Sequence, residues 1–239
     1  WRQLGNKGWG WNDVLPYFLK SENQERGQSN YHGVGGPLSV ADQRIKLSIL
    51  DAFMNAAEEV GIPKVNDFNK GDNFGCGYFQ VTEKNGLRCS AAVGYLNPIK
   101  KRKNLEIKTK CHVEKINFDG KKAISVSFWK DNNSLTIKAN KEIILSAGSI
   151  GSAQILQTSG IGDGNKLSQL GINVVKNSLG VGKNLQDHLM FRPVYKVKNI
   201  TTLNKKINSI IGKIMIGMEY VFFRRGPMTM GASLLCGFS

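Results

Sequence analysis

The sequence predicts a mixed α/β fold in which helix-forming and strand-forming segments alternate. Apolar residues repeat at helical spacing through 42–60, which is typical of an amphipathic helix. Over 105–139 the apolar period changes to two, which predicts antiparallel strands. At 143–148 a continuous apolar run turns through glycine into a helical pattern, as in a buried strand followed by a helix. Together these observations predict an α/β fold that also contains a β-meander.

Composition narrows the class of protein. The chain has 239 residues, 41% of them hydrophobic, with 27 glycines and 6 prolines. This balance fits one large or two small folded domains and excludes a disordered or collagen-like chain. The net charge of +15 is interpreted as a solvated basic surface. No basic stripe is interleaved with aromatic residues, so the sequence does not favour a nucleic-acid partner.

Cysteine spacing and hydropathy give little sign of a metal site or a membrane span. The four cysteines lack Cys-x-x-Cys spacing, so we predict no metal site and interpret them as buried free thiols. A disulfide in a secreted parent protein is the alternative, with its pairing open. The apolar segment 207–223 is interrupted by Lys213 and Glu219. A span needs about 20 nearly uncharged residues, so we predict an amphipathic helix packed against a core.

The first elements are a short helix and an extended segment. Asp13 is a candidate N-cap for a helix that ends at Lys20, with Pro16 in its first turn, where the missing N–H costs little. The segment 31–40 begins with glycines and becomes strand-like at its end. We therefore expect a turn-rich loop followed by a strand.

The next elements are two helices and a strand between them. The helix predicted over 42–60 is ended by Gly61 and the proline that follows two residues later. A strand is expected over Tyr78–Thr82. Ser90 is a candidate cap for a helix through Leu96, and the neighbouring Arg-Cys-Ser run is interpreted as a helix start because no general base lies near it in sequence.

The meander and the segment after it complete the predicted elements. Turn residues at Asp119-Gly120 and 131–133 separate three alternating runs within 105–139. Helices are expected after Gly148 and up to Leu170, where Gly171 ends the second one. Further strands are predicted at the buried run 143–145, at Ile172–Val175 and at Phe191–Val197.

The turn from the apolar run into the following helix is the first candidate site. Gly148 follows Ala147 there, and a glycine lets a ligand approach the backbone closely. The helix that begins at this point offers free N–H groups and the positive end of its dipole, which suit phosphate or flavin oxygens. Because strand–glycine–helix turns are common, this turn alone does not identify a function.

The longer string around this turn is more specific. Residues 143–162 read IILSAGSIGSAQILQTSGIG, which resembles the second sequence signature of the glucose–methanol–choline (GMC) oxidoreductases. Ala153 departs from it, since the family usually has proline or serine there. LGVGKNLQDH at 179–188 resembles the family's loop near the flavin, and the segments 8–24, 31–40 and 85–96 share its character. Among the branches of the family, the insect glucose-dehydrogenase-like branch is the most similar.

The resemblance implies flavin adenine dinucleotide (FAD) as cofactor and an alcohol or sugar as substrate. Hydride passes to the flavin N5 in this family, while a histidine near the C-terminus accepts the hydroxyl proton. The electron acceptor stays open, and a secreted location is compatible with the family. The resemblance also implies the residues that bind the cofactor. The backbone of Val113 is expected at the adenine. A group at a helix start lies along the dinucleotide and consists of Ala147, Gly148 and Ser149, and a loop group at the flavin end consists of Asn184, Asp187 and His188.

Catalytic residues are not expected within these 239 residues. By motif position His188 orders a loop and is not the proton acceptor, and His32 and His112 are expected to be solvated or structural. The Gly-x-Gly-x-x-Gly fingerprint and the C-terminal histidine pair do not occur in the sequence. The resemblance therefore predicts an internal fragment that is inactive alone.

The expected architecture is a partial, Rossmann-like FAD-binding domain interleaved with the start of an antiparallel substrate domain. The predicted division is a segment over the FAD and substrate region at 1–82, an FAD-binding portion at 83–188, and the start of the substrate domain at 189–239. The alternative is a non-catalytic basic binding module or the product of a decayed gene.

Overall fold

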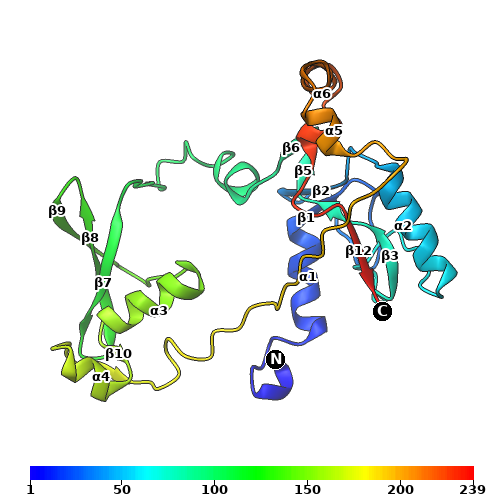
Figure 1. Cartoon of the computed structure of the whole chain (residues 1–239). Coiled ribbons are helices and arrows are strands. Elements are labelled where there is room, and N and C mark those ends of the chain that lie inside the picture. The colour runs from blue at the N-terminus through cyan, green and yellow to red at the C-terminus, as the bar shows by residue number, and fades with distance from the viewer. The chain divides into compact units, whose positions relative to one another are not determined.

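The computed structural model describes all 239 residues, which form two compact units (Figure 1). The first unit combines Trp1–Leu105 with Tyr195–Ser239, and the second is Glu106–Val194. The first unit therefore brings together two segments that are far apart in the sequence. The mixture of helices and small sheets agrees with the predicted α/β class.

The first helix is one turn longer at its start than predicted. After the short 3-10 turn η1 (Arg2–Leu4), helix α1 spans Trp11–Ser21. Gly10 is its N-cap, and the backbone N–H of Gly10 donates to the Asp13 carboxylate at 2.9 Å. The prediction that Asp13 is the N-cap is therefore wrong: its carboxylate closes the first turn from the third helical position. Pro16 consequently lies beyond the first turn.

Short strands form the sheets of the first unit. Strand β1 (Glu22–Gln24) pairs in parallel with β2 (Leu38–Asp42), and β2 pairs antiparallel with β4 (Gln80–Val81). Strand β3 (Gly75–Tyr78) pairs antiparallel with β12 (Leu235–Phe238), which joins the C-terminal segment to the rest of the unit. The single strand predicted over Tyr78–Thr82 is therefore two short strands in different sheets.

The helices of this unit are shorter than their apolar patterns. Helix α2 spans Ser48–Glu59 and not 42–60, because residues 41 and 42 belong to β2 and Leu47 is still extended. The hairpin β5 (Glu83–Lys84) and β6 (Leu87–Arg88) precedes η2, a π-helical turn over Ala92–Leu96. The Ser90 hydroxyl accepts the Val93 N–H at 3.3 Å, so Ser90 caps this turn as predicted.

The second unit contains the predicted meander. Strands β7 (His112–Asp119), β8 (Lys122–Lys130) and β9 (Asn133–Lys138) form one antiparallel sheet in that order. Helix α3 (Gly148–Thr158) lies along β7 (Figure 1). Strand β10 (Ile161–Gly162), helix α4 (Gly164–Gln169) and strand β11 (Lys176–Asn177) follow, with β10 and β11 paired in parallel.

Three strand predictions for this part of the chain are wrong. The run at 143–145 forms no strand, and Ile144 is 79% exposed. Residues 191–197 form none either, and Phe191 is 88% exposed. The strand expected at Ile172–Val175 lies instead at Lys176–Asn177. A central parallel strand needs hydrogen-bonded neighbours on both sides, and no strand of this structure pairs with 143–145.

The apolar segment near the C-terminus is helical, as predicted, but does not pack against a core. Helix α5 spans Leu203–Ile207 and helix α6 spans Ile210–Phe223, followed by the 3-10 turn η3 (Pro227–Thr229). Neither helix contains a buried residue. All helices of the structure fall short of the length and apolarity that a membrane crossing requires.

Candidate functional site

The start of helix α3 is an open backbone site. Ala147, Gly148 and Ser149 are all exposed. The Ser152 hydroxyl accepts the Ala147 N–H at 3.1 Å, but the N-cap residue itself makes no side-chain cap hydrogen bond to the first turn. Gly148 has φ +80°, and a Cβ built on it meets no protein atom within 4 Å. The first-turn N–H groups of a helix have no partner within the helix. The geometry therefore leaves N–H donors and free space where an anionic or dinucleotide ligand would fit.

The structure gives a second reason for glycine at position 148, besides the one that the sequence indicates. We expected glycine there because a ligand approaches closely. The structure adds that the backbone itself is in the left-handed region, where a side chain costs about 1–3 kcal/mol. A test of this position must therefore separate backbone strain from a clash with a ligand.

The far end of helix α3 is fixed to strand β7, which carries Val113. The Thr158 hydroxyl donates to the Glu114 carbonyl at 2.7 Å, and the Ile116 N–H donates to the Ser159 hydroxyl at 2.8 Å. Val113 itself is half-buried, opposite Phe128 of strand β8. The structure thus places the predicted adenine-side strand and the helix that begins at Gly148 in one packed assembly.

Gln157, which the sequence analysis did not single out, connects the glycine-containing loop at 179–183 to this assembly. The Gln157 side-chain amide donates to the Val181 carbonyl at 3.1 Å. A Cβ on Gly182 would lie 2.3 Å from Gln157 Nε2, and Gly182 has φ +76°. Lys183 Nζ lies 3.7 Å from an Asp163 oxygen. Gln157 lies outside the residues that carry the resemblance to the signature, so the sequence held no signal for this role.

The three predicted flavin-side residues extend beyond that anchored loop. Asn184, Asp187 and His188 are exposed, and Asn184 has φ +58°. The Asp187 carboxylate accepts the backbone N–H of the adjacent His188 at 2.8 Å. The structure places these residues in the same unit as Gly148 but shows no hydrogen bond that joins them to helix α3.

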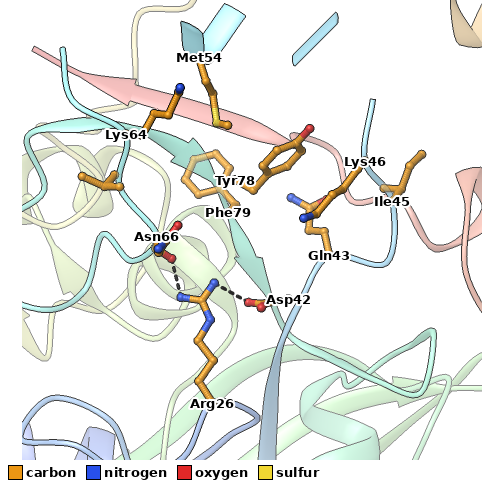
Figure 2. A pocket seen from close by; sticks show the side chains of 11 residues that line it. Arg26, Asp42, Gln43, Ile45, Lys46, Met54, Lys64, Asn66, Tyr78 and Phe79 are labelled. Atoms are coloured by element: carbon orange, nitrogen blue, oxygen red, sulfur yellow. Dashed lines mark hydrogen bonds and ion pairs between the residues drawn. The ribbon is translucent and has the colours of Figure 1, made fainter. Parts of the chain in front are cut away.

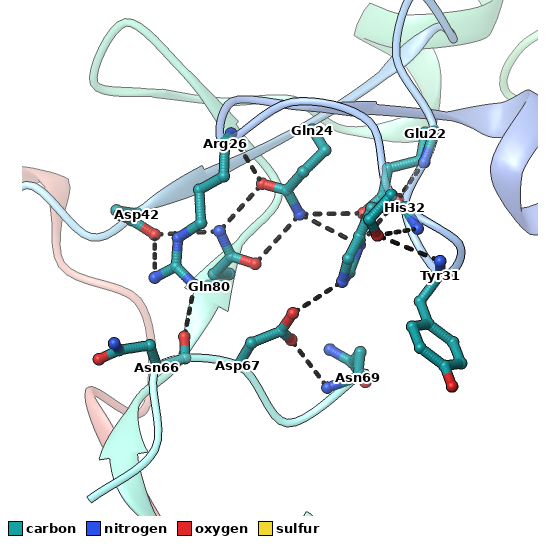
Figure 3. Close-up of polar contacts among 12 residues, drawn as sticks. Glu22, Gln24, Arg26, Tyr31, His32, Asp42, Asn66, Asp67, Asn69 and Gln80 are labelled. Atoms are coloured by element: carbon teal, nitrogen blue, oxygen red, sulfur yellow. Dashed lines mark hydrogen bonds and ion pairs between the residues drawn. The ribbon is translucent and has the colours of Figure 1, made fainter. Parts of the chain in front are cut away.

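The first unit contains a buried polar cluster that the sequence did not predict (Figure 3). His32 is 8% exposed, and its two ring nitrogens face Glu22 Oε2 at 3.0 Å and Asp67 Oδ2 at 2.9 Å. Burial alone would lower the pKa of His32, but the hydrogen bonds and charges of Glu22 and Asp67 outweigh burial and raise this pKa. His32 is therefore structural, one of the two roles expected for it.

A neighbouring cavity of 470 Å³ is lined by both charged and apolar side chains (Figure 2). Arg26 pairs with Asp42 at 2.7 Å, and Lys64 pairs with Glu58 at 2.8 Å. Gln43 Oε1 is buried without a hydrogen-bond partner. No nucleophile with a general base lines this cavity, and no group of three or more metal-ligating side chains occurs in the structure. We therefore assign no chemistry to it.

Comparison with known proteins decides the family. The model of the GMC oxidoreductase family matches residues 1–190. The chain belongs to this family. It is 40% identical over 228 residues to an oxygen-dependent choline dehydrogenase of Vibrio vulnificus, covering 95% of the chain and 40% of that protein. It is 37% identical over 222 residues to the mitochondrial choline dehydrogenase of Homo sapiens, covering 93% of the chain and 37% of that protein.

Solved GMC-type structures have the same fold. An FAD-dependent oxidoreductase from Chaetomium thermophilum matches 99% of the chain and 44% of its own length, with a TM-score of 0.87 and 30% identity. A formate oxidase matches 98% of the chain and 42% of its own length, with a TM-score of 0.81 and 26% identity. The chain thus spans about two fifths of the length of these relatives.

These findings support the family and FAD but not the expected branch. FAD is the cofactor of this fold, as the resemblance implied. The relatives compared are choline dehydrogenases, so the insect glucose-dehydrogenase-like branch has no support. The uncapped start of helix α3 and the free space around Gly148 fit a dinucleotide that lies along the backbone.

Proposed function

We propose that this GMC chain forms part of an FAD-dependent enzyme that oxidises the CH–OH group of a small alcohol. When bound, FAD supplies the hydride acceptor. The observation that carries the proposal is the open helix start at Gly148, which lies inside the residues that match the family. The part of this chain is then to hold and orient the cofactor.

Each cofactor-binding residue has a separate part in this proposal. The Val113 backbone contacts the adenine, and Ala147, Gly148 and Ser149 lie along the dinucleotide. The loop anchored by Gln157 directs Asn184, Asp187 and His188 to the flavin end. The proposal keeps the predicted division of the chain. Residues 83–188 form the FAD-binding portion, residues 1–82 lie over it, and residues 189–239 begin the substrate domain.

The names of the relatives bear on the substrate. Both relatives described above are choline dehydrogenases, which favours an alcohol with a quaternary ammonium group, such as choline, over a sugar. The proposal leaves the electron acceptor open. A non-catalytic basic module or decayed gene product is the competing account, and no contact in the structure favours it.

Anaerobic reduction of the flavin tests the proposal directly. The full-length gene product, purified with FAD, is mixed with choline, with simple primary alcohols and with glucose, and the visible flavin absorbance is followed. We expect an alcohol to bleach the flavin, choline faster than glucose. A protein that holds FAD but is bleached by none of these alcohols would contradict the proposed reaction, while one that binds no FAD would contradict the cofactor site.

A further inference from the structure

Three segments of the first unit meet at the ring of His32. Glu22 comes from strand β1, His32 from the glycine-rich loop before strand β2, and Asp67 from the loop that precedes strand β3. The side chains of all three are at most 17% exposed. Figure 3 shows the imidazole lying between the two carboxylates.

The geometry bears on the charge of the ring. A neutral imidazole has one N–H and can donate to only one acceptor, whereas the charged form donates from both nitrogens. In the structure both nitrogens face a carboxylate oxygen, at 3.0 Å on the Glu22 side and 2.9 Å on the Asp67 side. A neutral ring would leave a nitrogen lone pair against a carboxylate. The arrangement therefore favours the protonated histidine, which can donate to both carboxylates at once.

Neighbouring groups complete the hydrogen bonds of the two carboxylates. Glu22 Oε2 also accepts the Gly33 N–H at 3.0 Å, and Asp67 Oδ1 accepts the Asn69 N–H at 2.8 Å. The Gln24 side-chain amide lies 3.3 Å from the ring and donates to Gln80 Oε1.

The charges that face the ring are limited to the two carboxylates. Glu22 and Asp67 are the charged groups that hold the pKa of His32 above its usual range. Tyr31 and the α1 side chains that share the cavity, Trp11, Leu15, Phe18 and Ser21, are uncharged near neutral pH. The next charged pair, Arg26 with Asp42, is connected through Gln80.

The loop that carries Asp67 forms one wall of an aromatic cavity. Phe68, Asn69 and Gly71 follow Asp67 and line a cavity of 610 Å³. Trp11 and Tyr31 line the same cavity, with ring centroids 6.4 Å apart. The Tyr31 hydroxyl lies 3.2 Å from the position of a Cβ on Gly71. The position of the 66–74 loop therefore sets the shape of this cavity.

We propose that protonated His32 is a pH-sensitive clasp that holds the 66–74 loop against strand β1 and the glycine-rich loop, and that loss of this proton releases the loop. After deprotonation, Glu22 and Asp67 lose the positive charge between them and one of the two ring donors. Both carboxylates are then buried close to each other with uncompensated charge. Release of the loop lets water solvate them and opens the cavity.

The direction of the pH dependence follows from linkage. The folded-state pKa of His32 is raised above the unfolded value, so its stabilising effect is fully present below the unfolded pKa of about 6.5. That effect is lost as the pH rises through the raised pKa. The clasp is thus closed in mildly acidic solution and open in alkaline solution.

Two measurements on the wild-type protein test the clasp, and single-residue variants serve to assign the signals and as comparisons. Proton NMR follows the imidazole signals from about pH 5.5 to about pH 9, which brackets the ordinary histidine pKa of about 6.5. The chain has three histidines, so His112→Gln and His188→Gln assign the signals. Hydrogen exchange of the 66–74 peptide, corrected for intrinsic rates, is measured across the same range.

We expect His32 to titrate above about 6.5 and the 66–74 peptide to lose protection with the same midpoint. Asp67→Asn should lower both midpoints together. Asp72→Asn is the matched control in the same loop, because Asp72 accepts only the local Phe74 N–H, and it should move neither midpoint. Protection that stays constant while His32 titrates, or a His32 that titrates below about 6.5, would overturn the proposal.

Discussion

The two units fix their loops by different means. The first unit uses buried charged and amide side chains from segments far apart in sequence, as at Glu22, His32 and Asp67. The second anchors the loop at Gly182 by a neutral side-chain amide that donates to the backbone, from Gln157 to the Val181 carbonyl. The difference predicts a larger loss of folding free energy for substitutions at the buried charges of the first unit than for substitutions at the glycine-containing loop of the second.

The largest effect is expected when the clasp loses its cation. His32→Ala leaves Glu22 and Asp67 without the group that both contact. Breaking a buried ion pair by removing one partner costs about 3–5 kcal/mol. We expect the free energy of unfolding, measured by denaturant titration, to fall by about that amount at mildly acidic pH.

His188→Ala is the control for that substitution because His188 is exposed. Its cost should stay within about 0.5 kcal/mol, as for most surface substitutions. Equal costs for the two histidines would show that the first unit does not depend on its buried charges, and the contrast between the units would be lost.

A smaller effect is expected where the second unit anchors its glycine loop. In Gly182→Ala the new Cβ lies 2.3 Å from Gln157 Nε2 on a backbone with φ +76°. The amide must swing away and lose its bond to Val181, worth about 1 kcal/mol, in addition to about 1–3 kcal/mol of backbone strain. The free energy of unfolding should fall by the sum of the two terms.

A double-mutant cycle with Gln157→Ala separates the two terms. The coupling energy should be about 1 kcal/mol, typical of residues in contact. In Gly120→Ala the loss of unfolding free energy should come from backbone strain alone, because Gly120 has φ +56° and open space around it. A coupling energy near zero would mean that Gln157 does not hold the loop.

The smallest effect is expected at His188. This residue lies on the loop near the proposed flavin end, and we expect it to position that loop and not to accept a proton. His188→Asn keeps hydrogen-bonding capacity, so flavin reduction by the alcohol should slow by about tenfold, or about 1.4 kcal/mol of barrier. A fall of more than about a thousandfold in stopped flow, with loss of the basic limb of the pH profile, would show that His188 is the base.

Local patterns predicted most of the elements but few of the contacts between them. The meander was predicted from the two-residue period of its apolar residues, and helix α3 from the position of Gly148. Both signals are local, because they depend only on residues that are close in sequence. The strands expected at 143–145 and Phe191–Val197 do not form, because a strand exists only when another pairs with it. The His32 cluster was missed for a related reason: its members lie up to 45 residues apart, from Glu22 to Asp67, and nothing in their spacing marks them.

The sequence signature at 143–162 indicated the family, which the strand–glycine–helix turn alone could not do. Ala147, Gly148 and Ser149 lie at an open helix start, as the signature implied, and Val113 belongs to the strand that packs on the same helix. Gln157 was missed because its role depends on how the loop at Val181 folds back. Motifs thus predicted the residues proposed to contact the cofactor, while the residues that support them became visible only in three dimensions.

The central claim is that the dinucleotide passes beside Gly148, and a matched pair of glycines tests it most directly. Gly148→Ala and Gly120→Ala both place a side chain on a backbone with positive φ and with no protein atom within 4 Å, so neither variant adds a clash within the protein. In the full-length gene product, FAD titration should give a dissociation constant at least about tenfold weaker for Gly148→Ala, or about 1.4 kcal/mol, and an unchanged one for Gly120→Ala. Equal FAD affinity in the two variants, at equal thermal stability, would contradict the account.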